Sequence, residues 1–137
     1  MKKTGILIII VFFLVNTKVQ AQELTGTWRY STSSSKATVT GGKIENKNSS
    51  GKTGTLKLKL YASKRKYSGG SLNGYCLLSK RYEQLSANKY YYNIRINDSF
   101  SKPPSGRYYI TLCLMEYKNG GYRIVDYRNF NSSTVNF

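Results

Sequence analysis

The stretch from Arg107 to Phe130 reads RYYITLCLMEYKNGGYRIVDYRNF, with runs rich in Tyr, Ile, Val and Leu on either side of Asn119-Gly120. An Asn-Gly pair supplies the two positive-φ residues of a type I′ turn. Two apolar runs joined by such a pair predict a β-hairpin. The hairpin decides the fold class, because the remaining runs must then find places in β-sheets beside it.

The turn also sets the register of the two hairpin strands. It brings an aromatic pair and an opposite-charge pair together beside the loop, and both kinds of cross-strand neighbour stabilise a sheet. Apolar residues are expected to meet farther along. The predicted pairs are Lys118 with Gly121, Tyr117 with Tyr122, Glu116 with Arg123, Leu114 with Val125 and Leu112 with Tyr127, while Cys113 and Asp126 point to the other face.

The N-terminus has the pattern of a secretory signal peptide. Lys2 and Lys3 precede the apolar run from Ile6 to Val15, and the small-residue site Val19-Gln20-Ala21 follows. The run falls short of the roughly 20 residues that span a bilayer, which favours a cleaved peptide over a membrane anchor. We therefore expect residues 1–21 to be removed, no transmembrane span in the mature chain, and a secreted or periplasmic location.

Residues 22–137 are expected to form a single, strongly basic domain. This length suffices for one core and is too short for two. Without Lys2, Lys3 and Lys18, 19 basic and six acidic side chains remain, a formal charge of +13. Such a charge attracts polyanions over about 8 Å at physiological salt. The alternative is that the charge only keeps the protein soluble.

Strict alternation marks the strand expected over Thr55–Ala62. Leu56, Leu58 and Leu60 face one side of it, and Lys57, Lys59 and Tyr61 face the other, as in a strand with one buried and one wet face. Other strands are expected over Leu24–Thr32, Lys36–Thr40, Tyr75–Leu85, Tyr90–Ile96, in the hairpin after Pro103-Pro104, and over Thr134–Phe137, with Gly41-Gly42 as an interruption.

These runs predict an all-β fold. No window after the signal peptide has a helical period. Seven to eight short strands separated by turn residues indicate an antiparallel two-sheet sandwich of immunoglobulin-like type, with a small closed barrel as the alternative. Five apolar side chains are expected in its core: Leu58, Leu60, Ile110, Leu112 and Leu114.

Several landmarks lie between Gly54 and Phe137. They are GTLKLKLYA (54–62), YSGG (67–70) leading to Gly74-Tyr75, Leu85-Ser86, PPSGRYYI (103–110), Glu116-Tyr117 and VDYRNF (125–130). Together they resemble the small immunoglobulin-like modules of secreted bacterial proteins, including those of the cell-adhesion-related type, which often accompany hydrolases. The resemblance implies a non-catalytic, extracytoplasmic role in binding or adhesion.

A second resemblance covers only Leu24-Thr-Gly-Thr-Trp28. This stretch is similar to the Gly-x-Trp box that opens lipocalin-like barrels. It implies an alternative function, a carrier that holds a small apolar ligand in a central cavity.

The composition argues against an enzyme. The chain has no His, the commonest general base and metal ligand. Glu116 is expected to pair with Arg123, and Asp126 to make a structural hydrogen bond or ion pair. No two of the six carboxylates form a close pair by motif, as a glycosidase would need. We therefore expect no catalytic residue, no metal and no cofactor.

Cys76 and Cys113 are the two cysteines. In an immunoglobulin-like sandwich they are expected on strands C and F, which are antiparallel neighbours, with both sulfurs on the outer face. An exported protein can hold such a pair as a disulfide. The sequence leaves a disulfide and two separate thiols as equal alternatives.

Binding is the remaining class of function. Basic residues gather beside aromatic ones in the run Lys64-Arg65-Lys66-Tyr67 and again at Lys80-Arg81. Lys and Arg hold phosphate, sulfate or carboxylate groups, and Tyr stacks on sugars or bases, although Tyr is also simply a good strand former. These six residues are the candidate polyanion site. The expected partner is an anionic polysaccharide, a cell-envelope surface or a protein, rather than nucleic acid, because the chain is exported.

Overall fold

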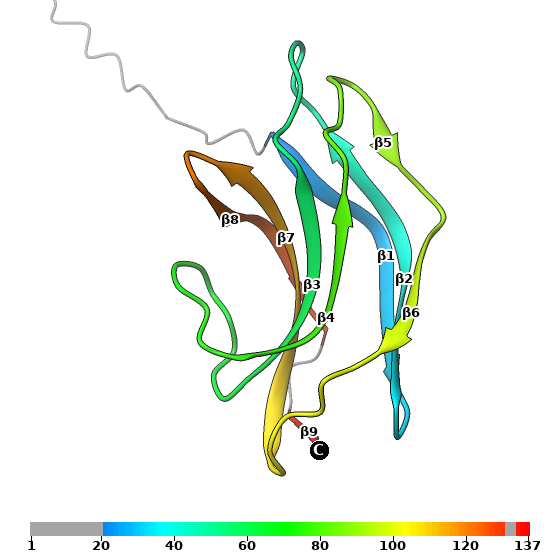
Figure 1. Ribbon diagram of the computed structural model, residues 1–137, viewed down its shortest axis with the longest axis vertical. Helices are drawn as coiled ribbons and strands as arrows, with labels where there is room; N and C mark the ends of the chain where they lie inside the picture. Colours follow the sequence, from blue (N-terminus) through cyan, green and yellow to red (C-terminus); the bar gives the residue numbers. More distant parts are fainter. Residues whose placement is uncertain (1–20, 131–133) are drawn as a thin grey trace, which may run out of the picture.

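The computed structural model describes residues 21–130 and 134–137. The predicted signal peptide, apart from Ala21, lies outside the described residues. Within them the chain forms strands and no helix, and the strands build two antiparallel sheets that face each other (Figure 1). The predicted all-β class and the two-sheet arrangement are confirmed.

The smaller sheet has β2 at its centre. On one side β2 pairs with β1, and on the other side it pairs first with β6 and then with the short strand β5. Asn93 has a φ of 50°, and this bend separates β5 from β6 where one strand was expected. The bounds are β1 (Gln22–Thr32), β2 (Lys36–Asn46), β5 (Tyr90–Tyr91) and β6 (Ile94–Ser99).

The larger sheet has the order β4-β3-β7-β8, with β9 pairing the start of β7. The hairpin β7–β8 therefore forms one side of this sheet, and β3 lies between β7 and β4 (Figure 1). The bounds are β3 (Leu56–Ser63), β4 (Tyr75–Tyr82), β7 (Arg107–Lys118), β8 (Gly121–Asn129) and β9 (Val135–Asn136).

The core fills the space between the sheets. Alternate residues of β3 and β7 face inward, as the sequence pattern predicts, and all five expected core residues are buried. Trp28 is also buried and belongs to this core. The members with an exposure of 1% or less are Leu24, Ala37, Val39, Ile44, Leu56, Leu58, Leu60, Ala62, Tyr108, Ile110, Leu112 and Leu114.

The predicted turn and the three register pairs nearest to it are confirmed. Asn119 and Gly120 have φ angles of 53° and 87°, the positive values that a type I′ turn requires. Glu116 lies opposite Arg123, and the pairs Tyr117–Tyr122 and Lys118–Gly121 follow. The rings of Tyr117 and Tyr122 meet edge to face, with 5.2 Å between their centroids.

Farther from the turn the predicted register is wrong. The partners step from Ile124 to Asp126 between two consecutive residues of β7, so β8 contains one extra residue, Val125. This bulge places Leu114 opposite Asp126, and Leu112 opposite Arg128. Because one extra residue exchanges the two faces of a strand, Asp126 is turned inward and is buried.

The predicted interruption of the strand at Gly41-Gly42 is wrong. Strand β2 runs through both glycines, and it is the partner strand β1 that is irregular, between Thr25 and Trp28. A Cβ at Gly42 would lie 1.7 Å from the Thr25 carbonyl oxygen. The glycine is therefore needed for the close approach of the two backbones, and the indole of Trp28 donates a hydrogen bond to the same carbonyl at 3.0 Å.

Candidate functional site

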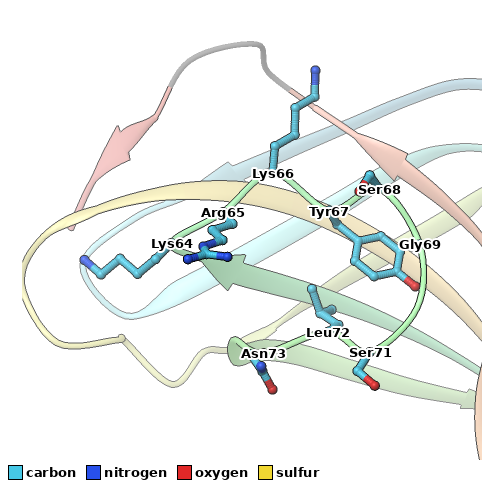
Figure 2. A pocket seen from close by; sticks show the side chains of 9 residues that line it. All are labelled: Lys64, Arg65, Lys66, Tyr67, Ser68, Gly69, Ser71, Leu72 and Asn73. Atoms are coloured by element: carbon cyan, nitrogen blue, oxygen red, sulfur yellow. The ribbon is translucent and has the colours of Figure 1, made fainter.

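The loop over residues 64–73 joins β3 to β4 and carries the densest basic run. It borders an open surface hollow of about 610 Å³ (Figure 2). The three cations of the run do not converge: Lys64, Arg65 and Lys66 point in different directions in Figure 2. The ammonium of Lys64 lies 3.9 Å from the centroid of the Tyr108 ring and donates to the Arg107 carbonyl at 3.3 Å.

Tyr67 anchors this loop to the larger sheet. Its side chain is buried, and its hydroxyl donates to the Gly70 carbonyl at 2.8 Å. Its ring meets Tyr127 edge to face at 4.7 Å, and its carbonyl accepts a hydrogen bond from Asn129 at 2.9 Å. These contacts occupy Tyr67 inside the fold, so it holds the loop in place and offers little ring surface to a ligand.

Lys80 and Arg81 occupy opposite faces of β4. Lys80 lies across from the buried Leu58, on the inward face of this edge strand, yet it remains exposed. Inward-pointing charges on edge strands oppose edge-to-edge association. Arg81 lies across from Lys57 on the outer face and forms an ion pair of 2.8 Å with Glu83.

The outer face of the larger sheet places Arg81, a residue of the predicted polyanion site, beside two lysines that the prediction did not include. Lys57 and Lys59 alternate with buried leucines on β3, so both project outward beside Arg81. The ammonium of Lys57 lies 4.2 Å from the centroid of the Tyr122 ring, and that of Lys59 lies 6.0 Å from Tyr61. Among the described residues, neither lysine forms an ion pair with a carboxylate.

Tyr122 lies within this group of cations. Its hydroxyl is 2.9 Å from the Thr55 hydroxyl. The hydrogen bond with Thr55, followed by a bond with Arg81 and the charges of Lys57 and Arg81, lowers the pKa of Tyr122 below its ordinary value. The Thr55 hydroxyl has the largest effect on this pKa, and the nearby cations add to it. The alternation of residues 55–62 revealed the two lysines, but no local pattern placed Arg81 or Tyr122 beside them.

Cys76 and Cys113 are both free thiols, so of the two alternatives that the sequence left open, the structure has two separate thiols. The predicted adjacency of their strands is wrong because β3 lies between β4 and β7. Two strand spacings alone separate the cysteine backbones by at least about 9.5 Å, beyond the roughly 7 Å that a disulfide tolerates. Burial, with a smaller contribution from Cys76, raises the pKa of Cys113 to about 12, so the thiol stays protonated.

The two carboxylates singled out in the hairpin have structural roles. Glu116 is buried and accepts hydrogen bonds from the Gln22 side chain at 3.3 Å and the Gly54 backbone at 3.1 Å. It also pairs with Arg123 at 3.7 Å, as predicted. Asp126 pairs with Arg128 at 3.3 Å. Within the described residues, no group of three or more His, Cys, Asp or Glu side chains could hold a metal ion.

A second aromatic group lies on the smaller sheet. Tyr90 and Tyr92 are exposed, and their rings meet edge to face with 5.9 Å between centroids. The ammonium of Lys43 lies 4.3 Å from the centroid of the Tyr90 ring. This group carries one cation, whereas the outer face of the larger sheet carries three.

Comparisons of the chain with protein-family models, curated proteins and solved structures found no match. Over the residues that the structure describes, no helix has the length and apolar character needed to cross a membrane.

Proposed function

We propose that this chain is an extracytoplasmic, non-catalytic binding module with an immunoglobulin-like fold, which docks on an anionic polysaccharide of the cell envelope or its surroundings. The single observation that carries the proposal is the clustering of Lys57, Lys59 and Arg81 on the outer face of the larger sheet. Cations gathered on one face raise the local concentration of a polyanion and pair with its charged groups.

The strand order supports the immunoglobulin-like part of the proposal. In such sandwiches, strands A, B and E share one sheet, and strands C′, C, F and G share the other. Here β1, β2 and β6 are neighbours in one sheet, and β4, β3, β7 and β8 in the other. The connections are therefore compatible with that topology strand by strand.

Tyr108 supplies a second argument for this fold. It lies at the start of β7, the strand in the position of F, and only 1% of its surface is exposed. Its hydroxyl donates to the carbonyl of Pro104, four residues upstream, at 2.7 Å. A buried Tyr at the start of strand F that bonds back to the preceding backbone is a recurring feature of immunoglobulin-like domains, known as a tyrosine corner.

A binding module is favoured over a carrier of apolar ligands. The space between the sheets is occupied by leucine, isoleucine, valine and aromatic side chains. Trp28, which carried the resemblance to lipocalin-like barrels, is one of them. The charges lie on the outside, on a chain with a net charge of +16.

Binding to a heparin column tests the proposal, with three variants that each lose three positive charges. The first is Lys57→Ala/Lys59→Ala/Arg81→Ala, and the second is Lys64→Ala/Arg65→Ala/Lys66→Ala. The matched control is Lys36→Ala/Arg95→Ala/Lys102→Ala, whose residues are exposed and lie outside the larger sheet. The dependence of log K on log salt is measured for each protein.

The first variant should lower the salt slope by about two to three, because up to three ion contacts are lost. The loop variant should lower it less, since its cations diverge. The control should stay within about 0.5 of the wild-type slope. Equal decreases of the salt slope in all three variants would mean that only the total charge matters, and would overturn the proposed site. A wild-type protein that elutes from the column at low salt would overturn the proposed function.

A further inference from the structure

A groove runs along the outer face of the larger sheet, between the loop anchored by Tyr67 and strand β8. Its volume is about 470 Å³, within the range of about 300–1,000 Å³ in which small-molecule sites fall. The sheet contributes Tyr61, Met115, Tyr122 and Ile124 to its lining, and the loop contributes Leu72. The groove lies on the sheet side of the loop and shares Tyr67, Ser71 and Leu72 with the hollow of Figure 2, whose lining residues all belong to the loop.

Part of the lining is apolar at positions where an exposed sheet face is ordinarily polar. Met115 and Ile124 lie opposite each other on β7 and β8, and both project outward, away from the core. All five lining residues named above are half-buried, so the groove is partly covered and still open. An apolar surface left open in this way marks an interaction site.

Cations stand beside this apolar floor. Lys57 lies across from Met115 on the neighbouring strand, and its ammonium contacts the ring of Tyr122. Lys59 lies beside Tyr61. The lining itself includes one cation, Arg123, and the two lysines stand beside it. A ligand that fills the groove and extends toward β3 would therefore meet apolar side chains and positive charges at once.

We infer that this groove is the subsite that holds individual rings of an acidic polysaccharide, with the apolar floor against the C–H face of a sugar and Lys57 and Lys59 on its carboxylate or sulfate. The inference rests on the proposed function and adds the place where a sugar ring is held. Charge complementarity requires an anion, and the apolar floor requires a ring or another apolar surface. Inorganic polyphosphate has the charge and lacks the ring.

The groove exists before the ligand arrives. Tyr67 fixes the loop through its contacts with Gly70, Tyr127 and Asn129, and its backbone and ring both take part. A preformed wall reduces the ordering that binding would otherwise cost.

The experiment compares three polyanions by calorimetry at fixed salt. An oligomer of galacturonic acid carries sugar rings, inorganic polyphosphate carries no ring, and single-stranded DNA carries bases. Tyr61→Ala/Met115→Ser removes the apolar floor from the sheet side and leaves every charge in place. Leu72→Ser removes it from the loop side without touching a strand, so a folding defect in the first variant does not decide the outcome. Tyr92→Ala, on the smaller sheet, is the matched control.

We expect both floor variants to bind the galacturonic acid oligomer at least tenfold more weakly, and polyphosphate within twofold of wild type. The control should match wild type on both probes. Equal losses on the two probes, or no loss on either, would overturn the ring subsite and leave the proposed function standing. If the wild type bound single-stranded DNA more tightly than the galacturonic acid oligomer, and both floor variants weakened that binding, the groove would hold bases and the proposed sugar subsite would be wrong. Absence of wild-type binding to every polyanion would overturn both.

Discussion

The carboxylate of Asp126 on β8 accepts a hydrogen bond from the backbone N–H of Leu24 on β1, with 2.7 Å between Oδ2 and N. Arg128 binds this carboxylate and also donates to the Leu24 carbonyl. One buried acid and one arginine thus join the first strand of the smaller sheet to the last long strand of the larger one. The bulge at Val125 is what turns Asp126 toward this partner.

Replacing Asp126 by Ala should therefore destabilise the protein by about 3 kcal/mol, since it leaves a buried N–H and a partly buried guanidinium without their acceptor. Urea denaturation measures the free energy of unfolding. Asp98→Ala is the control, because Asp98 is exposed and, within the described residues, its side chain accepts a hydrogen bond only from the backbone of the next residue, Ser99. A similar small loss in both variants would show that the bond between the sheets contributes little.

Gly42→Ala should cost about 3 kcal/mol or more, at the upper end of the range for overpacking, because its Cβ would collide with the Thr25 carbonyl. Gly121→Ala is the matched control: no atom lies within 4 Å of its added Cβ. It should change the free energy of unfolding by no more than about 0.5 kcal/mol. Thermal denaturation compares the two variants. Equal midpoint temperatures for Gly42→Ala and Gly121→Ala would contradict the close approach of β1 and β2.

Leu112→Ala should cost roughly 2–5 kcal/mol, the range for removing a large buried apolar side chain. Leu112 is 1% exposed and lies opposite Leu60 on β3. Ile124→Ala, on the outer face of the same hairpin, should cost clearly less. Denaturant titrations of both proteins give the comparison, and a loss below about 0.5 kcal/mol for Leu112→Ala would mean that the inward and outward faces of β7 are exchanged.

Alkaline pH should weaken the fold through Cys113. Its pKa of about 12 in the folded protein exceeds the ordinary value of 9.0, so above pH 9 the unfolded chain releases a proton that the folded chain retains. Stability is therefore fully present below pH 9 and falls as the pH rises toward 12, by up to about 1.4 kcal/mol per pH unit.

The matched measurement is the free energy of unfolding at pH 8 and pH 10 for the wild type and for Cys113→Ala. The variant should lose less stability between the two pH values than the wild type. Cys76→Ala should retain most of the wild-type dependence, because Cys76 is only half-buried. Identical pH dependence in wild type and Cys113→Ala would remove the buried thiol as the cause.

The sequence predicts the parts of this fold that are decided locally. Asn119-Gly120 specifies its turn by backbone conformation alone, and the alternation over residues 55–62 assigns Leu58 to the core and Lys57 to the outside. The bulge at Val125 has no such local signal. It is explained by the bond between Asp126 and Leu24, which lies 102 residues away in the chain.

In the candidate site, too, some features can be predicted from local sequence and others depend on residues far apart in the chain. The basic run at Lys64 is visible in the sequence, but its side chains diverge in the fold (Figure 2). The cations that converge come from β3 and β4, and the order of those strands decides that Arg81 lies beside Lys57. The groove requires Tyr67 to fold back onto Asn129, a contact that spans 62 residues. No periodicity within a strand reports contacts of that kind.

The rate at which Cys113 is alkylated measures how often the loop that covers it opens. The thiol lies on the outer face, yet it is fully buried, and Tyr67 and Tyr127 stand next to it. A reagent reaches its sulfur only when this covering lifts, whereas Cys76 is partly accessible throughout. The ratio of the two alkylation rates in the native protein therefore reports how often the loop lifts from Cys113. A bound ligand that holds the loop in place would slow the reaction of Cys113 alone.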